Sequence, residues 1–236
     1  MQAPVAPTHA VLLLVRWRWF SLPAGLLRLM MGPWGVGKPE GLCFTKVLGT
    51  GLNGGFGLWP GLRHQGLMAF FQDAASAQRF VRDSRVLRAR RLAADESLLA
   101  VLRVTSARGS WDGHTLAVAS GDHPEPGPDA PVAALTRASI RPVSARRFWS
   151  HSPASERALA QSQGCRLAIG LGEAPVLRQA TFSLWDSVPA MRAYAAGAAH
   201  GHAAQEALRH GWFSEWLFAR FEPLSLQGRW QGHEHP

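Results

Sequence analysis

The sequence is poor in cysteine and lysine. It holds only two cysteines, Cys43 and Cys165, so no dense disulfide framework can support the fold. Lysine occurs only at Lys38 and Lys46, and arginine therefore carries almost all of the formal net charge of +9. An arginine bias of this kind is typical of GC-rich genomes, so we do not expect a nucleic-acid partner. The basic surface still favours anionic partners such as cofactor carboxylates or lipid headgroups.

The chain also lacks a long hydrophobic run. The run AVLLLV, residues 10–15, is far shorter than the roughly 20 residues that a membrane-spanning helix needs. Neither the charged first region nor the cleavage site of a signal peptide is evident, so we expect a cytoplasmic protein. The stretch WFSLPAGLLRLMMGPWGVG, residues 19–37, is nevertheless rich in large apolar side chains. It could hold the protein peripherally against a membrane surface.

The sequence does contain a repeated order of predicted elements. Alternating or continuously apolar residues predict strands, and apolar residues spaced three to four apart predict helices. In the first half we expect strand, helix, strand, strand, helix and strand at residues 9–19, 22–31, 41–51, 65–73, 76–93 and 97–109. In the second half the same order falls at residues 131–142, 145–161, 165–173, 178–186, 188–211 and 215–224.

The two halves are offset by roughly 115–120 residues, which indicates an internal duplication. The most similar pair is MAFFQDAASAQRFV, residues 68–81, and TFSLWDSVPAMRAY, residues 181–194. Each half has the β-α-β-β-α-β order of a ferredoxin-like unit, and each alone would leave one sheet face uncovered. We therefore predict an α+β fold in which two tandem ferredoxin-like repeats form an intramolecular α+β barrel.

The predicted domain boundaries follow from this repeat. With 236 residues and 47% hydrophobic content, the chain can bury one large core or two small ones. We expect a first repeat, a linker rich in proline and glycine, a second repeat and a tail. These cover residues 9–113, 114–130, 131–226 and 227–236.

The segment AAHGHAAQEALRHGWF, residues 198–213, is unusually rich in histidine. As a helix, it would place His200 on a face of alanines, and His202 and His210 on the opposite, polar face. His200 and His202 would point in nearly opposite directions and could not chelate one ion. Neither an HExxH motif nor a Cys/His zinc spacing occurs in the sequence.

His200 has more than one interpretation. Alanines around an inward histidine leave room for a flat ring, as at the proximal ligand of a haem. A core histidine bonded to a backbone carbonyl is the alternative, and such histidines are common. A thiolate haem ligand at Cys165 is a further candidate, although Cys43 and Cys165 fall on equivalent strands, which is more typical of core packing.

The glycine-rich stretch GTGLNGGFGLWPGLRHQG, residues 49–66, is too long for a tight hairpin. It matches neither a P-loop nor a dinucleotide-binding motif. Glycines at this density allow a backbone to approach a ligand closely, so Asn53 and Phe56 are candidate cofactor contacts. A plain surface loop is the alternative.

Two groups of arginines are candidates for binding anions. In LTRASIRP, Arg137 and Arg141 alternate with Ser139, so they could pair with haem propionates from one strand face or form a surface ladder. The arginines of the second predicted helix include Arg82, Arg85, Arg88, Arg90 and Arg91. They form either a solvated face or a docking surface for an acidic partner.

Several separated motifs resemble the spheroidene monooxygenase family of carotenoid biosynthesis. They lie in order between about residues 10 and 224: RWRWF, KVLGTGLNGGFGLWP, LTRASIRPVSARRFW, IGLGEAP, QATFSLWDSVPAMRAYA and GWFSEWLFARFEPL. The resemblance implies a haem-containing oxygenase that introduces a keto group at C2 of acyclic carotenoids such as spheroidene. The reaction would proceed by successive hydroxylations with O2 and reducing equivalents. The resemblance also places the family's histidine, about eleven residues before the GWF motif, at His200.

Together these observations favour a haem-b monooxygenase of an apolar substrate, with His200 on the iron and Arg137 or Arg141 on the propionates. Electrons would come from an external donor such as a ferredoxin, because the sequence has no flavin or nicotinamide motif. One alternative is a haem lyase of the aldoxime-dehydratase type, which needs no net electrons. Another is a non-enzymatic haem- or lipid-binding module, in which His64 could supply a sixth ligand.

Overall fold

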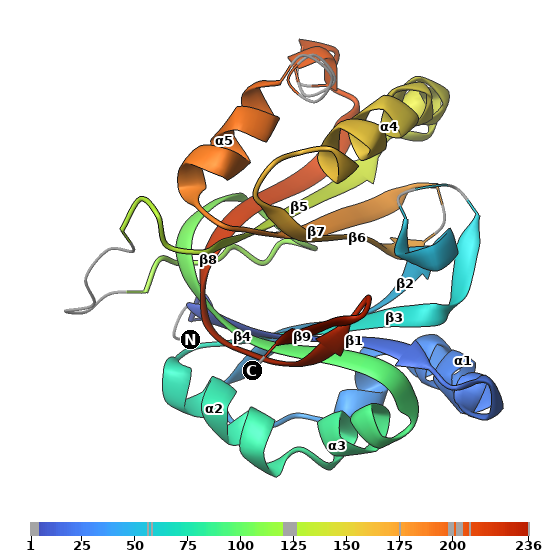
Figure 1. Ribbon diagram of the computed structural model, residues 1–236, viewed down its shortest axis with the longest axis vertical. Helices are drawn as coiled ribbons and strands as arrows, with labels where there is room; N and C mark the ends of the chain where they lie inside the picture. Colours follow the sequence, from blue (N-terminus) through green and yellow to red (C-terminus); the bar gives the residue numbers. More distant parts are fainter. Residues whose placement is uncertain are drawn as a thin grey trace.

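A computed structural model describes the fold of most of the chain. Within the described residues, eight long strands form an antiparallel sheet that closes into a barrel, and helices cover it on two opposite sides (Figure 1). The α+β class and the closed barrel that the sequence predicts are therefore present. The described residues are 5–55, 57, 59–119, 127–174, 176–197, 201, 205–207 and 209–235.

The first half contains four strands and two helical regions. Its elements are β1 (His9–Trp17), η1 (Trp19–Ser21), α1 (Leu22–Met31), η2 (Gly32–Val36), β2 (Leu42–Gly51), η3 (Leu52–Gly54), β3 (Pro60–Phe71), α2 (Ala74–Asp83), α3 (Arg85–Leu92) and β4 (Ala94–Gly109). The single helix predicted at residues 76–93 is wrong, because Ser84 has an extended backbone and separates α2 from α3. The Ser84 side chain accepts a hydrogen bond from the Leu87 N–H and so caps α3.

The second half repeats this order. Its elements are β5 (Val132–Ile140), η4 (Pro142–Ser144), α4 (Ala145–Ala160), β6 (Cys165–Ala174), β7 (Arg178–Trp185), α5 (Val188–Ala196), β8 (Phe213–Trp230) and β9 (His233–His235). The continuous helix predicted at residues 188–211 is wrong, because α5 ends at Ala196 and Gly197 has a non-helical backbone with ψ of 148°. Among the described helices, none combines the length and the apolar character needed to cross a membrane.

The end of the chain belongs to the barrel. Residues 227–236 were predicted to form a tail outside the second repeat, but β8 continues to Trp230 and β9 pairs with it. The Trp230 side chain is buried in the barrel interior. The predicted tail therefore contributes to the core.

The sheet closes through two junctions between the halves. The strand order is β4-β1-β3-β2-β6-β7-β5-β8, and β4 also pairs with β8. At one junction, β2 and β6 pair only at Gly49–Gly172 and Thr50–Leu171. At the other, β4 and β8 pair along most of their lengths. The long junction makes the two halves one continuous structure.

Both faces of the sheet are buried, which explains the continuously apolar strands. One face fills the barrel interior with side chains such as Leu12, Phe70 and Phe221. The other face packs against the helices, as Leu13 and Phe71 do in the first half. A strand covered on both faces needs apolar residues at every position, and β1 has buried residues along almost its whole length.

Candidate functional site

The two halves differ in the side chains that their sheets turn toward the helices. In the first half these side chains are mostly large and include Val11, Leu13, Val15, Leu67, Phe71 and Leu99. In the second half they are small. We call the second set the small-residue floor, and it comprises Ala134, Thr136 and Ala138 of β5, Ala168, Gly170 and Gly172 of β6, and Thr181 and Ser183 of β7.

The register places the members of the floor side by side. Thr136 lies opposite Thr181, which in turn lies opposite Gly170. The three atoms nearest to a Cβ added at Gly172 belong to its own sheet, to the Arg178 carbonyl and the Gln179 side chain, at 3.5 Å or more. The small-residue floor thus presents only glycines and short side chains toward the second-half helices.

The first half is packed differently at the comparable junction strand. A Cβ added at Gly49 of β2 would lie 3.7 Å from the Leu29 side chain of α1. In the second half, α4 and α5 pack mainly against one end of the sheet, through a small cluster around Leu159, Trp185 and Met191. Among the described residues, the apolar cluster beneath α4 and α5 is smaller than the one beneath the first-half helices.

Arg220 borders the small-residue floor, and its guanidinium has no acceptor among the described residues. It lies opposite Ala134 on β8, between the interior residues Ala219 and Phe221, so its side chain is on the helix-facing side. Its Nε atom is buried, and among the described residues the guanidinium makes neither a hydrogen bond nor an ion pair. A buried cationic donor without a partner favours an anionic group as its ligand.

Tyr194 and Cys165 lie at the edge of this space. Burial, and then the charge of Cys165, raises the pKa of Tyr194 to about 12, so its phenol stays protonated at neutral pH. Burial also raises the pKa of Cys165 above its usual value, and its thiol donates to the Leu167 carbonyl at 3.6 Å. A protonated thiol in this environment speaks against the predicted alternative of a thiolate ligand at Cys165.

Arg137 lies inside the barrel, on the face opposite to the small-residue floor. It is 1% exposed, and its guanidinium contacts Glu215, Asp112 at 3.2 Å and Glu173 at 3.3 Å. Lys46 contacts Asp112 and lies 2.9 Å from Glu173. We call these five residues the interior ion cluster. Because three carboxylates already engage Arg137, we revise the prediction that it holds a propionate.

The interior ion cluster makes stability depend on acid pH. Burial would raise the pKa of Glu215, but N–H groups of Gly113 and Asp112, the Ser110 hydroxyl and Arg137 outweigh it and lower the pKa to about 2.

Since the folded pKa lies below the ordinary value, Glu215 stabilises the fold above about pH 4.5, and this contribution is lost as pH falls toward 2. We expect urea midpoints of the native chain to fall across this interval, and those of Glu215→Gln to fall less steeply. Equal slopes for the two proteins would contradict this assignment.

The other predicted site residues are placed as follows. Arg141 is exposed after the end of β5, and its Nε donates to the Phe213 carbonyl at 3.4 Å. Asn53 is exposed in η3 with φ of 55°, a left-handed conformation that asparagine tolerates. His200 and Phe56 lie outside the described residues. Their predicted roles stay predictions.

The glycine-rich stretch reaches from the first half to the second. A Cβ added at Gly54 would lie 3.7 Å from the Ile169 side chain of β6. A Cβ added at Gly55 would lie 2.7 Å from the carboxylate of Glu156 in α4. Glycine at these positions therefore lets the loop approach the second-half sheet and α4 closely.

His64 belongs to the glycine-rich stretch in sequence, but it lies on strand β3 and not in a loop. It faces the barrel interior, where its ring centroid lies 5.7 Å from that of Trp230. Burial, followed by the charges of Arg16 and Arg63, lowers its pKa. The helix-facing floor lies on the other side of the sheet, so His64 does not border it. Within the described parts of the chain, no group of three or more His, Cys, Asp or Glu side chains could hold a metal ion.

Sequence reasoning missed Arg220, although a signal was present. In EWLFARFEPL, apolar Leu217, Ala219 and Phe221 alternate with Phe218 and Arg220, which indicates a strand with two different faces. Alternation alone does not say which face lies inside a closed sheet. The partners of Arg137 were also missed, because they come from three separate segments.

Comparison with known proteins identifies similar sequences of one kind. The chain is 51% identical over 201 residues to the spheroidene monooxygenase of Rubrivivax gelatinosus, which covers 85% of this chain and 75% of that protein. It is 36% identical to the spheroidene monooxygenase of Rhodobacter capsulatus, across 91% of this chain and 89% of that protein. No family model matches the chain.

Among solved structures, aldoxime dehydratases have a similar fold. One superposes with a TM-score of 0.60 at 11% identity, covering 94% of this chain and 83% of that one. Another, aldoxime dehydratase OxdRE with butyraldoxime, gives 0.59 at 10% identity over 94% of this chain and 81% of that one. At this identity the likeness concerns the fold alone.

Proposed function

Because this chain belongs to the spheroidene monooxygenase family, we propose that it is a haem-b-dependent monooxygenase acting on an acyclic carotenoid. The product would carry a keto group at C2, as the sequence resemblance implies. The observation that carries the cofactor proposal is the small-residue floor with Arg220 at its border, which has no acceptor in the part of the chain that the structure describes. A planar, largely apolar ring with acidic substituents matches that combination of space and charge.

The proposed cofactor site lies between the small-residue floor and the second-half helices. His200 would hold the iron from the segment after α5. Arg220 would pair with one propionate, and Arg141 is the remaining candidate for the other. Asn53 and Phe56 keep their predicted roles as contacts from the glycine-rich loop.

When bound, haem supplies activation of O2 for hydroxylation of a C–H bond, with electrons from an external donor such as a ferredoxin. The chain itself would shield the reaction from water and orient the substrate. Trp216 and Phe218 lie on the floor side of β8, opposite Ala138 and Thr136, and offer apolar surface to a polyene. The protonated Tyr194 phenol donates to the Ser155 carbonyl at 3.4 Å and ties α5 to α4 above the floor.

We also propose that each half is a ferredoxin-like unit and that the two arose by duplication. The strand orders β4-β1-β3-β2 and β8-β5-β7-β6 are the same when read from the long junction. The helices follow the first and third strand of each half. On this view only the second unit kept a floor small enough for a cofactor.

The experiment that tests the cofactor is a UV–visible spectrum of protein expressed with a supply of haem. We expect a Soret band, and a ferrous–CO band at the position typical of histidine-ligated haem. His200→Ala should lose the Soret band because the iron loses its protein ligand. His210→Ala is the matched control, since that side chain is 45% exposed in the same segment and should keep full haem content.

Two outcomes would contradict the assignment. Full haem content in His200→Ala would move the ligand to another residue, and a CO band typical of thiolate ligation would point to Cys165. Absence of haem from the native protein would instead favour a binding module without this chemistry.

The lyase alternative differs from the proposed monooxygenase in its consumption of O2 and reductant. A monooxygenase consumes O2 and reductant for each keto group formed, whereas dehydration of an aldoxime consumes neither. Activity on acyclic carotenoids that requires O2 and reduced ferredoxin supports the proposal. Turnover of aldoximes without O2 would replace it.

A further inference from the structure

The helix layer outside the first half exposes an unusual number of large apolar side chains. They all lie in a stretch of sixteen residues that begins in η1, includes α1 and ends in η2: Trp19, Phe20, Leu27, Met30, Met31 and Trp34. Trp34 is 91% exposed, Met30 85% and Phe20 80%. Contiguous exposed groups of this kind mark interaction sites in proteins.

This apolar stretch is firmly attached to the barrel by its other side. A Cβ added at Gly25 would lie 2.7 Å from the Trp17 ring, so α1 packs directly on that ring. The Gln65 side chain donates to the Gly25 carbonyl at 3.0 Å, and Leu29 packs against the first-half core. The helix that carries Leu27, Met30 and Met31 is therefore packed against the barrel by its opposite side.

Arg28 of α1 and Arg90 of α3 have no acceptor among the described residues. Arg90 of α3 is 1% exposed, its Nε is buried without a partner, and Nη1 of Arg28 is likewise buried and unpaired. Among the described residues, neither guanidinium makes a hydrogen bond or an ion pair. The Arg28 guanidinium lies 5.4 Å from the centre of the Trp17 ring, whose Nε1 also lacks an acceptor.

These donors form a site that is positive and short of anions. Burial, and then the charge of Arg28, lowers the pKa of Arg90 to about 10, so Arg90 remains charged at neutral pH. Two neighbouring cations and an indole N–H, all without acceptors, are the groups that bind a phosphate oxygen.

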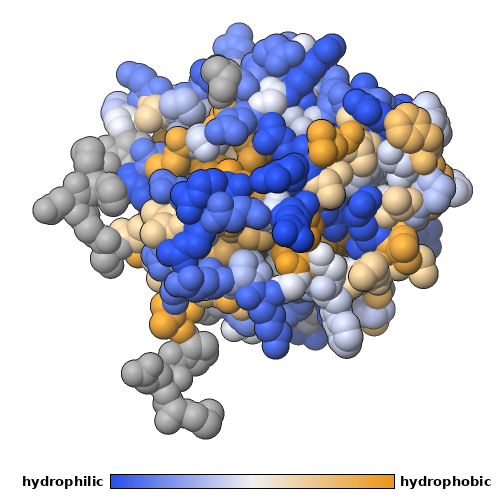
Figure 2. All heavy atoms as spheres, turned by 90° about the horizontal axis from the view of Figure 1, so that it is seen from below, coloured by the Kyte–Doolittle hydropathy of each residue, from blue (hydrophilic) through white to orange (hydrophobic). Residues whose placement is uncertain are grey.

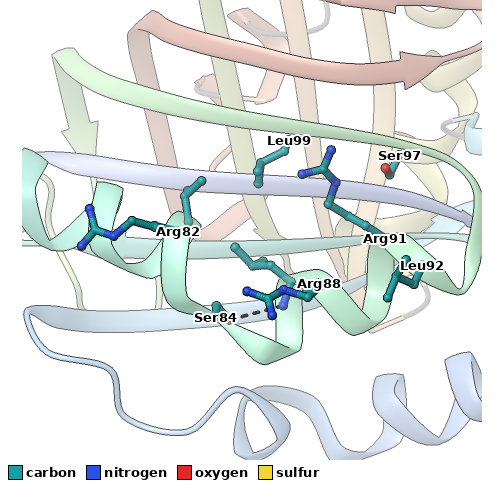
Figure 3. A pocket seen from close by; sticks show the side chains of 9 residues that line it. Arg82, Ser84, Arg88, Arg91, Leu92, Ser97 and Leu99 are labelled. Carbon is teal, nitrogen blue, oxygen red and sulfur yellow. Dashed lines mark hydrogen bonds between the residues drawn. The ribbon is translucent and has the colours of Figure 1, made fainter.

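A basic groove lies on α2, α3 and β4. The groove has a volume of about 470 Å³. Figure 3 shows the side chains that line it, and three arginines are among them: Arg82, Arg88 and Arg91. The acidic Asp83 beside it is paired with Arg82 at 3.1 Å. The groove is therefore cationic and large enough for a phospholipid headgroup.

The apolar stretch and the basic groove belong to one side of the molecule. Figure 1 places α1, α2 and α3 together in the layer below the barrel, away from α4 and α5. Figure 2 views the molecule from this side, with hydrophobic side chains exposed toward the end where α1 lies, beside a hydrophilic area. We call this side the first-half helix face.

We propose that the first-half helix face docks on a membrane that contains anionic phospholipids. Side chains of the α1–η2 stretch enter the interfacial region, while Arg28, Arg88 and Arg91 pair with lipid phosphates. Large apolar groups next to arginines are the composition of interfacial membrane helices. This docking does not depend on the proposed reaction, since the small-residue floor lies on the opposite side of the barrel.

The charge of the face favours lipid over a second copy of the chain. A symmetric dimer through this face would bring the same arginines of two copies together, with no surplus of carboxylates to neutralise them. An acidic protein would neutralise the arginines but would leave the protruding Trp34, Met30 and Phe20 without a function. An anionic bilayer would neutralise the arginines and also take up the protruding apolar side chains.

The test is co-sedimentation of the intact chain with vesicles of phosphatidylcholine alone or mixed with equimolar phosphatidylglycerol. We expect binding to the mixed vesicles that weakens as salt is added. The variant Phe20→Ser/Met30→Ser/Trp34→Ser should bind at least tenfold more weakly, because the side chains that enter the interface are gone. Arg88→Gln/Arg91→Gln should bind more weakly and lose part of the salt dependence.

Matched controls come from the second half. Val143→Ser removes an apolar side chain that is also 91% exposed, and Arg146→Gln removes an exposed arginine of α4. Both should bind like the native chain. Equal affinity of all variants, or equal binding to both kinds of vesicle, would overturn the proposal. A dimer in solution that the triple variant abolishes, without vesicle binding, would assign the face to a second copy.

Discussion

Replacing Arg137 by methionine is expected to lower the free energy of unfolding by about 3–5 kcal/mol, which is the usual effect of removing one partner from a buried ion pair. The Arg137 side chain is 1% exposed and contacts three carboxylates, of which Asp112 is 34% exposed and Glu173 15%. Without it, Lys46 is the one remaining cation of the interior ion cluster, and it contacts Asp112 and Glu173. The loss is measured by urea denaturation at neutral pH.

Arg178→Met is the control for that measurement. Arg178 also faces Asp112, at 3.6 Å, but its side chain is 48% exposed. An exposed ion pair contributes about 1 kcal/mol or less. If Arg137→Met lost no more stability than this control, the interior ion cluster would not be a structural element, and a role for Arg137 in binding a ligand would return. The double variant Arg137→Met/Glu215→Gln should recover part of the loss, because one of the unpaired carboxylates is then neutral.

Replacing Thr136 by leucine is expected to weaken haem binding without unfolding the protein. Thr136 lies at the centre of the small-residue floor, between Thr181 of β7 and Phe218 of β8. Leucine is compatible with a strand but fills the space that the proposed cofactor needs. Overfilling a packed site costs about 1–3 kcal/mol, which corresponds to a loss of affinity of roughly ten- to a hundredfold.

Haem titration followed at the Soret band measures this effect, and thermal unfolding of the haem-free proteins tests that the fold is kept. Thr115→Leu makes the same substitution at an exposed position and should leave both quantities unchanged. Native affinity in Thr136→Leu would show that the floor does not receive the cofactor. Because the experiment reads binding rather than turnover, it separates a misplaced site from a mistaken substrate.

Local patterns in the sequence carried the prediction of most elements. The strands and helices of both halves occur near the predicted ranges, because hydrophobic period and capping residues act over a few residues. The two helix predictions that were wrong concern segments in which one residue interrupts the helix. The extended backbone at Ser84 and the non-helical Gly197 each divide a segment whose side-chain pattern continues across the break.

The candidate site depended on information that local patterns do not contain. Arg137 and Arg220 both sit on strands covered on two sides, so alternation defined their faces without saying which one lies inside the barrel. Only closure of the sheet turned Arg137 inward and left Arg220 toward the helices.

The sequence by itself therefore determined the order of the elements, the α+β class and the resemblance to one family, since each of these depends on local periodicity or on motifs in order. The tertiary structure decided the small-residue floor, the interior ion cluster and the first-half helix face. Lys46 and Glu173, for example, meet across 127 positions of sequence. Such groups exist only when the strand register brings distant residues together, and no local pattern encodes that register.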